Sequence, residues 1–326
     1  MTASSPRTIS RSLSGFLCGT HSGPLRSRRG YRLPLDAAAA AHRALASPPE
    51  GVPVELGQVR WAPEGRASEL SRRLTAALDH EHVVELVLFG SQARGGTTRF
   101  SDVDAILVIS DAAAEEPRVL RGLRRRVLAA QRAVLAHQPM QHHGFEVTTP
   151  GLLKLAGESL ALPRVALEET RSLRGRGVLG RFRNNDGPAG PGSMSGVAKS
   201  VLGTEAWPRH PWRVHRLVSM FELLPTLYLQ SQGRAVPKWQ SFAQAQAEFG
   251  AEWWPYDVLR EVRSAWPLVS GSVLRAASVA VRNPWLGVEL WTRLPANTPE
   301  PVRDLLSTDC LHGLHGLARR MLGGVP

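Results

Sequence analysis

The sequence is poor in cysteine, lysine and isoleucine, and it has no long hydrophobic run. Two cysteines, Cys18 and Cys310, occur among 326 residues. They are too few for a zinc ribbon or a disulfide scaffold and typical of a reducing compartment, so a cytoplasmic location is expected. No stretch of 18 apolar residues is present, which excludes a transmembrane helix. The composition, 43% hydrophobic and 21% charged, predicts a globular protein with a sizeable core.

The formal net charge of +12 comes almost entirely from arginine. Of the 40 basic residues, 37 are arginine and three are lysine: Lys154, Lys199 and Lys238. Together with the scarcity of isoleucine, this skew indicates high-GC codon usage rather than a dedicated phosphate-binding face. The positive field would still attract nucleotides or other anions. A basic nucleic-acid-binding module, with steeply salt-dependent affinity, therefore stays open as an alternative.

The chain length favours two domains. Residues 1–53 are predicted to be a flexible basic tail, because the first 35 residues carry six arginines and no acid. The catalytic domain is expected over 54–182, and the Gly/Pro/Ser-rich stretch 183–200 has linker composition. Residues 201–326 are predicted to be a mainly helical domain, with eight of the nine tryptophans between Trp207 and Trp291.

Within the catalytic domain, the apolar run Val83–Phe89 predicts a buried strand that leads into a glycine-rich turn. The periodicity then predicts a helix at 68–78, a strand at 103–109, a helix from about 115 to 134 and a short strand at 145–148. These elements frame the residues that carry chemistry.

The chemistry lies in the segment LFGSQARG, followed by FSDVDAIL. Gly90 and Ser91 follow the first strand at a turn, where free backbone amides and the Ser91 hydroxyl can bind a phosphate. Asp102 and Asp104 stand at positions i and i+2 of the next strand. Alternation places both carboxylates on one face, with Cα atoms about 6.6 Å apart at a rise of about 3.3 Å per residue.

Two carboxylates on one face repel each other unless a cation lies between them. Aspartate oxygens suit Mg²⁺, which uses few protein carboxylates and completes its coordination with phosphates and water. A phosphate-binding turn beside a divalent-cation site indicates metal-assisted phosphoryl or nucleotidyl transfer.

This pattern closely resembles the DNA polymerase beta-like nucleotidyltransferase superfamily, and it is similar to the small bacterial nucleotidyltransferase domains and the aminoglycoside nucleotidyltransferases. The resemblance implies an α+β fold: a mixed-sheet catalytic domain followed, in this chain, by the mainly helical domain. It also implies two Mg²⁺ ions, an NTP donor and a third carboxylate from a neighbouring strand. The best match for that carboxylate is Glu146, in the apolar context of GFEV. Asp111 is the fallback.

The resemblance extends more loosely into the helical domain. Lys238, in VPKW, is expected to meet the β- and γ-phosphates of the donor, and Arg94 is expected to orient the loop or a phosphate. The resulting site is Asp102, Asp104 and Glu146 for metal and catalysis, with Gly90, Ser91, Arg94 and Lys238 for the nucleotide. Glu146 or Glu222 is a candidate general base, and the sequence leaves this choice open.

The expected reaction is transfer of AMP from ATP to a hydroxyl acceptor. A small molecule similar to an aminoglycoside fits the chain length and the helical second domain. A protein hydroxyl, as in toxin–antitoxin nucleotidyltransferases, and an RNA 3′ end are alternatives. A non-catalytic nucleotide-binding regulator is the alternative outside enzymology.

Three other patterns are read as structural. His142-His143 and His312-x-x-His315 are interpreted as solvated or core histidines, because the sequence shows no cysteine or carboxylate partners at suitable spacing. The GRGVLG run at 175–180 lacks a preceding apolar strand, so a dinucleotide site is rejected. The tryptophan-rich region is expected to be helix-packing core.

Overall fold

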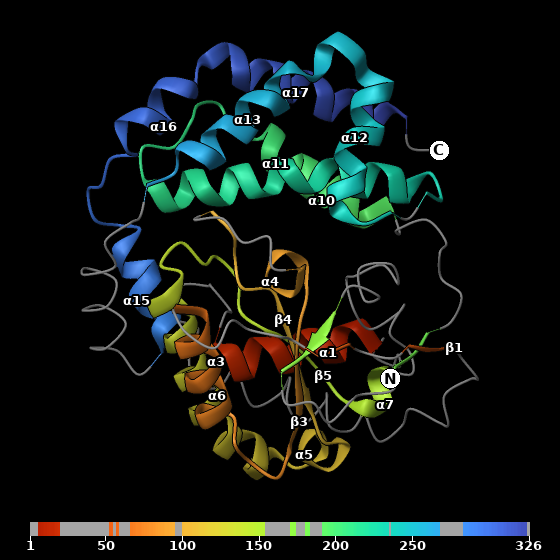
Figure 1. Cartoon of the computed structure of the whole chain (residues 1–326), viewed down its shortest axis with the longest axis vertical. Helices are drawn as coiled ribbons and strands as arrows, with labels where there is room; N and C mark the ends of the chain where they lie inside the picture. The colour runs from red at the N-terminus through yellow and green to blue at the C-terminus, as the bar shows by residue number, and fades with distance from the viewer. Residues whose placement is uncertain are drawn as a thin grey trace.

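The computed structural model is an α+β unit, built on a mixed sheet, with a layer of helices over one end of that sheet (Figure 1). It describes residues 6–19, 52–54, 57–58, 66–94, 100–153, 170–173, 180–182, 191–234, 236–267 and 283–324. Within these ranges, no helix combines the length and apolar character needed to cross a membrane.

Five of the described strands form one sheet, in the order β2 (Gly57–Gln58), β6 (Arg171–Ser172), β3 (Val83–Leu88), β4 (Ala105–Ile109), β5 (Glu146–Thr148). Strands β3 and β4 are antiparallel, whereas β4 and β5 are parallel, so the sheet is mixed as predicted. A separate antiparallel pair is formed by β1 (Val52–Val54) and β7 (Gly180–Phe182).

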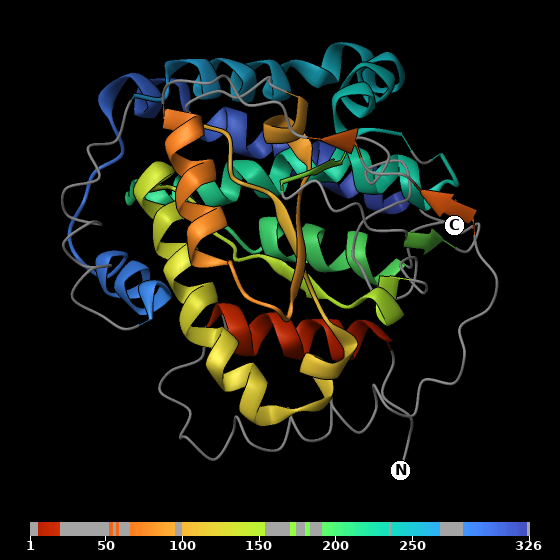
Figure 2. The same cartoon turned by 60° about the horizontal axis from the view of Figure 1, so that its bottom comes forward.

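The helices of the α+β unit pack against the sheet and connect its strands. Their bounds are α1 (Pro6–Cys18), α3 (Arg66–Ala77), α4 (Gly90–Arg94), α5 (Asp111–Glu115), α6 (Pro117–His137) and α7 (Pro150–Leu153). The core between α1, α3, α6 and one face of the sheet includes Leu74, Leu107 and Val127, all fully buried (Figure 2). Helix α6 starts where expected, because Pro117 occupies its first turn and the Glu116 carboxylate accepts from the Arg118 N–H.

A second hydrophobic core lies in the helical layer and also includes Phe100, Leu135 and Met140 of the α+β unit. The layer consists of α10 (Pro191–Leu202), α11 (Pro211–Ser231), α12 (Lys238–Phe249), the 3₁₀ turn η2 (Gly250–Trp253), α13 (Trp254–Ala265), α16 (Glu300–Leu305) and α17 (Thr308–Gly323), whereas α15 (Pro284–Trp291) lies beside the α+β unit (Figure 1). Trp253, Trp266 and Trp291 are buried in this core, as predicted, while Trp239 and Trp254 are exposed. His315 is likewise a core histidine, hydrogen-bonded to the Val201 carbonyl.

Two expected boundaries are wrong. The predicted linker 183–200 contains most of α10, whose Met194, Ala198 and Val201 are fully buried. The strand expected from Val103 begins at Ala105, so Asp102 and Asp104 lie in the extended segment immediately before β4. The rest of the linker, and all but Gly180 of the GRGVLG run, lie outside the described residues.

The prediction of a flexible N-terminal tail is wrong for Pro6–Cys18, which forms α1. Ile9, Leu13 and Leu17 are at most 1% exposed and pack into the core of the α+β unit. Fully burying each of these side chains contributes about 1.5–3 kcal/mol. Residues 1–5 and 20–51 of the predicted tail lie outside the described residues.

Helix α1 also covers the edge of the sheet. β5 is the last of the described strands in this order, so its outer backbone groups pair with none of them. The Ser10 hydroxyl donates to the Val147 carbonyl at 2.7 Å, and the Val147 N–H donates to the Ser14 hydroxyl at 2.7 Å. Two serine side chains thus replace a neighbouring strand and protect an edge that would otherwise be open to pairing.

Leu13→Ala should therefore lower the free energy of unfolding by about 2–5 kcal/mol, because it leaves a cavity between α1 and the sheet. Leu294→Ala is the matched control, since Leu294 is 54% exposed, and its effect should stay within about 0.5 kcal/mol. Urea unfolding of both variants measures the difference. Equal stability of the Leu13→Ala protein and the wild type would contradict the packing of α1.

Candidate active site

The segments that carry the predicted site residues of the α+β unit meet at one end of the sheet, where three strands adjoin. Leu88 at the end of β3 pairs with Ala105 at the start of β4, and Ile106 pairs with Glu146 at the start of β5. The turn at Gly90 follows β3 directly. The sheet therefore brings together segments that are far apart in the chain, and this end faces the helical layer (Figure 1).

Two buried glutamine side chains hold the backbone around Asp102 and Asp104. Gln141 accepts from the Val103 N–H at 2.8 Å and donates to the Val103 carbonyl at 3.1 Å. Gln138 donates to the Ser101 carbonyl at 2.7 Å. These contacts do what a neighbouring strand would do. They hold the segment in place, with Val103 buried in the core and both aspartates partly exposed.

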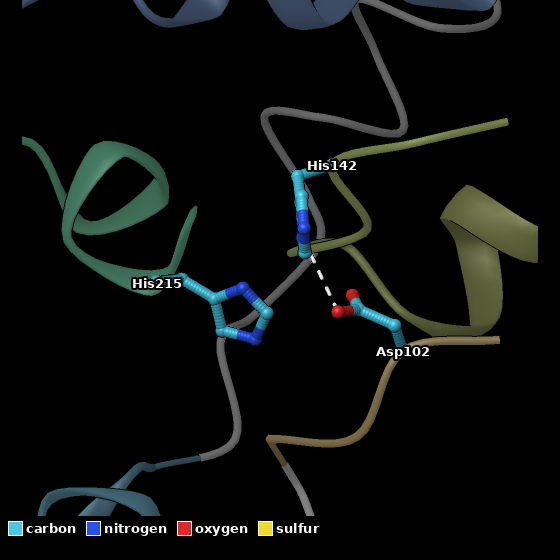
Figure 3. A group of neighbouring side chains, drawn as sticks. All are labelled: Asp102, His142 and His215. Carbon is cyan, nitrogen blue, oxygen red and sulfur yellow. Dashed lines mark ion pairs between the residues drawn. The ribbon is translucent and has the colours of Figure 1, made fainter. Parts of the chain in front are cut away.

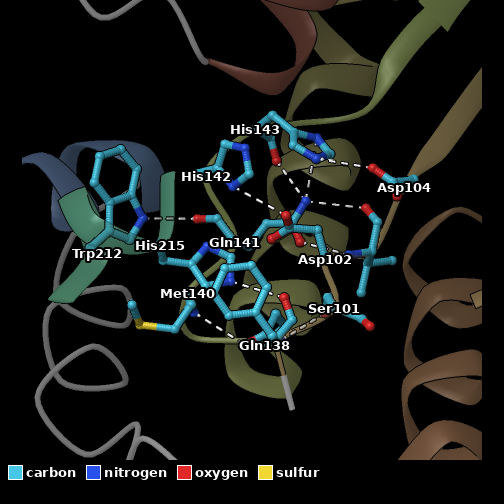
Figure 4. A network of polar contacts seen from close by, with 12 residues as sticks. Ser101, Asp102, Asp104, Gln138, Met140, Gln141, His142, His143, Trp212 and His215 are labelled. Carbon is cyan, nitrogen blue, oxygen red and sulfur yellow. Dashed lines mark hydrogen bonds and ion pairs between the residues drawn. The ribbon is translucent and has the colours of Figure 1, made fainter. Parts of the chain in front are cut away.

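Each aspartate has an imidazole next to it (Figure 4). His142 Nδ1 lies 3.2 Å from Asp102 Oδ2, and His143 Nε2 lies 3.1 Å from Asp104 Oδ1. The interpretation of this histidine pair as residues without carboxylate partners is therefore wrong. The partners come from a distant, earlier segment of the chain, which spacing alone does not reveal.

The imidazoles change the ionisation of the site. Burial opposes the charged form of His143, but the hydrogen bond to Asp104 and the negative charges of Asp104 and Asp102 together outweigh burial and raise the pKa of His143 to about 9. Burial would raise the pKa of Asp102, but the adjacent His142 and, more weakly, His215 and His143 hold that pKa well below its usual range. The site at neutral pH thus keeps an ionised Asp102 and a cationic His143.

A third histidine reaches the site from the helical layer. His215 on α11 is fully buried, its ring stacks on Phe100 with centroids 3.9 Å apart, and its Nε2 lies 2.9 Å from the Phe100 carbonyl. Burial lowers the pKa of His215 to about 4, so the ring is neutral at pH 7. Figure 3 shows it facing Asp102 and His142.

At Gly90 the backbone of the turn comes very close to the Asp104 carboxylate. The glycine's φ of +66° lies in the left-handed region, and a Cβ built there would stand 2.7 Å from Asp104 Oδ2. Ser91 follows in α4 and is partly buried, whereas Arg94 ends this helix and is exposed. The turn and the second aspartate are therefore adjacent in space.

The structure places the two candidates for the third carboxylate at opposite ends of β4. Glu146 pairs with Ile106 and so shares the face of Asp104, which stands two residues before Ile106. Asp111 follows the other end of β4, where its Oδ1 accepts from the Gly151 N–H at 3.0 Å at the start of α7. The strand register therefore favours Glu146 over Asp111.

Lys238 and Glu222, both from the helical layer, contact each other. Lys238 Nζ lies 3.6 Å from Glu222 Oε2. Glu222 is 3% exposed and accepts from Arg263 Nη1 at 2.9 and 2.8 Å with its two oxygens. The Arg263 guanidinium lies 5.3 Å from the centre of the Phe100 ring, and Phe100 stands two residues before Asp102. This chain of contacts connects Lys238 to the aspartate segment.

Residues 70–142 match the model of the nucleotidyltransferase domain family. The chain carries a nucleotidyltransferase domain. The match runs from α3 to His142 and includes Gly90, Asp102 and Asp104, whereas His143, Glu146 and the residues of the helical layer lie outside it. The protein is accordingly a transferase of phosphorus-containing groups, and its general reaction is the transfer of a nucleoside monophosphate. No curated protein and no solved structure matched the chain.

Sequence reasoning missed five residues around the nucleotidyltransferase site: Gln138, Gln141, His142, His143 and His215. Four of them lie within the short run QPMQHHG between α6 and β5. The sequence signal for these four residues is the polar run itself, which lies between two elements with apolar stripes and directly before the strand that begins at Glu146. Nothing in the local sequence marks His215, which lies between Val214 and Arg216 in α11.

Gly90→Ala should impair nucleotidyl transfer more than it impairs folding. The positive φ costs about 1–2 kcal/mol for an L-residue, and the new methyl group must displace the Asp104 carboxylate. Gly233→Ala is the matched control, because Gly233 has φ +75° and a methyl group added there would meet nothing within 4 Å. Both variants should lose similar stability in thermal unfolding. Only Gly90→Ala should lose pyrophosphate release, and equal activity of the two would contradict the role of this contact.

Proposed function

We propose that the protein transfers AMP from ATP to a hydroxyl group of a small molecule, in a Mg²⁺-dependent reaction. The observation that carries the proposal is the position of Asp102 and Asp104 beside the Gly90 turn, at the sheet end that the helical layer covers. The match to the nucleotidyltransferase domain over residues 70–142 supports the same reaction.

The residues of the site fit a divalent cation. Asp102 Oδ1 is buried and has no hydrogen-bond partner among the described residues, and a buried carboxylate oxygen in that state requires a cation or donor. Asp102 and Asp104 would hold the two Mg²⁺ ions, and Glu146 would join them at the catalytic one. When bound, Mg²⁺ lowers the pKa of the acceptor hydroxyl and neutralises charge on the triphosphate.

The nucleotide would be held by groups on both sides of the site. The backbone amides at Gly90 and Ser91 and the Ser91 hydroxyl would donate to phosphate oxygens. Arg94, at the exposed end of α4, and Lys238, 46% exposed at the start of α12, would add positive charge. Lys238 contacts a glutamate that Arg263 already neutralises, which leaves the ammonium available for a phosphate.

The reaction forms a bond between the acceptor oxygen and the α-phosphorus and breaks the bond from that phosphorus to the α,β-bridging oxygen. Pyrophosphate leaves, and the hydroxyl proton passes to a base. Glu222 is a poor candidate for this base because its carboxylate oxygens already contact Arg263 and Lys238. Glu146, at the start of β5, is the better candidate, and it would accept this proton.

The acceptor is proposed to enter between the sheet end and α11. Trp212 on α11 donates to the Gln141 carbonyl at 3.1 Å, and His215 contacts the Phe100 carbonyl, so this helix covers the aspartate segment. A helix laid over the carboxylates restricts the access of large substrates and favours a small acceptor. A protein hydroxyl and an RNA 3′ end are then alternatives that an acceptor panel separates.

Asp102→Asn, Asp104→Asn and Glu146→Gln should each lower nucleotidyl transfer by about 10²–10³-fold or more, because each removes charge that stabilises the transition state. Glu81→Gln is the control, since this exposed carboxylate lies beyond the opposite end of β3. Pyrophosphate release and transfer of label from α-³²P-ATP are measured with aminoglycosides, cell protein and total RNA as acceptors.

Full activity of the Asp102→Asn and Asp104→Asn variants would contradict the proposed site. Label on protein or RNA, with none on small molecules, would contradict the proposed acceptor and leave the reaction intact. Mg²⁺-dependent ATP binding without any transfer would identify a non-catalytic nucleotide-binding regulator. Steeply salt-dependent nucleic-acid affinity that survives Asp102→Asn would indicate a binding module.

A further inference from the structure

Asp102, His142 and His215 form a compact group of potential metal ligands. Each residue offers one ligand atom, and the three atoms all lie within 4.8 Å of one another (Figure 3). The three residues come from separate elements: the segment before β4, the segment before β5, and α11 of the helical layer. The packing of three elements thus creates the group.

The atoms that face one another in this group lack other partners. Asp102 Oδ1, His142 Nδ1 and His215 Nδ1 are all buried without a hydrogen-bond partner among the described residues. His142 Nδ1 has only the ionic contact to Asp102 Oδ2 at 3.2 Å. Three buried polar atoms in this state, one from each residue of the group, are costly in a folded protein unless something binds them.

The ring of His215 is already oriented for a metal ion. Its Nε2 lies 2.9 Å from the Phe100 carbonyl, which can only accept, so Nε2 carries the proton and Nδ1 carries the lone pair. Metal-binding histidines commonly donate their second ring nitrogen to a carbonyl in this way, which fixes the tautomer and the ring. Stacking on Phe100 and an edge contact with Trp266 hold the ring in place.

We propose that Asp102, His142 and His215 bind a transition-metal dication, Zn²⁺ being the best fit. Two imidazoles and one carboxylate suit zinc rather than magnesium, and three protein ligands leave a fourth position for water or a phosphate oxygen. This ion is distinct in its ligands from the proposed Mg²⁺ ions, although Asp102 is shared. The inference goes beyond the proposed reaction and does not depend on it.

Such an ion would tie the helical layer to the nucleotidyltransferase domain. His215 lies on α11, whereas Asp102 and His142 belong to the region matched by the family. Binding to the folded protein stabilises it by mass action, so Zn²⁺ should raise the unfolding temperature. Because zinc and magnesium would compete for Asp102, saturating Zn²⁺ should inhibit any Mg²⁺-dependent activity.

The test is a titration of the metal-free full-length protein with Co²⁺, which reports histidine coordination through its visible d–d absorption. The wild type should bind one Co²⁺ with intense absorption typical of a low coordination number, and Zn²⁺ should displace it. His142→Gln and His215→Gln should each weaken binding at least about 100-fold, because changes in the outer shell alone weaken affinity about 10–100-fold. His312→Gln, at an exposed position of α17, is the matched control.

The titration of the wild-type protein tests the proposal even if a variant fails to fold. Circular dichroism shows whether each variant is folded. The proposal is overturned if the wild type shows no such absorption, or if the signal disappears with Asp102→Asn but persists in both histidine variants. The latter result would indicate a carboxylate site of the Mg²⁺ type. Co²⁺ binding as expected with no pyrophosphate release under any condition would instead contradict the proposed reaction and leave the zinc site standing.

Discussion

The backbone groups of Ser101 and Val103 are held by side chains rather than by a neighbouring strand, and the site depends on this constraint. Gln138 and Gln141 bind the Ser101 and Val103 backbone groups, and both glutamines are buried. A buried amide that satisfies backbone groups in this way is costly to remove, because its partners are then left unpaired. Because Gln138 and Gln141 hold this backbone, two carboxylates can lie outside the sheet, just before the first residue of β4, on an ordered segment.

The same segment joins the two layers of the molecule. The carbonyl of Gln141 accepts from Trp212, and the carbonyl of Phe100 accepts from His215. Two residues of α11 therefore contact the segments that precede β5 and β4. Arg263 and Trp266 also contact the Phe100 ring. Packing of the helical layer and ordering of the aspartate segment are therefore coupled. The layer that would shape the proposed acceptor site also supports the segment that carries Asp102 and Asp104.

Much of the site could be predicted from the sequence because its signals are local. The apolar run that leads to Gly90, the spacing to Asp102 and Asp104, and the apolar flanks of Glu146 all specify neighbouring strand ends, and the structure brings these ends together. The match to the nucleotidyltransferase family confirms the recognised superfamily and the α+β class. The roles of the individual site residues stay predictions.

The features that were missed depend on contacts distant in the chain. Helix α1 is specified by its fit to β5, where Ser10 and Ser14 meet Val147 more than 130 residues later, and composition alone suggested a tail. The segment of α10 resembles a linker in composition because it is rich in glycine and serine. Its three buried apolar residues, Met194, Ala198 and Val201, are too few to indicate a helix from the sequence. The imidazoles opposite the aspartates were missed for the same reason, since their partners are defined only by the packing of three elements.

The most direct test of the central claim is a crystal structure of the protein with Mn²⁺ and a non-hydrolysable ATP analogue. We expect anomalous density for manganese at Asp102 and Asp104, with the triphosphate against the turn at Gly90 and Ser91. Nucleotide and metal bound elsewhere on the molecule, or ordered nucleotide with no metal at these two carboxylates, would contradict the claim.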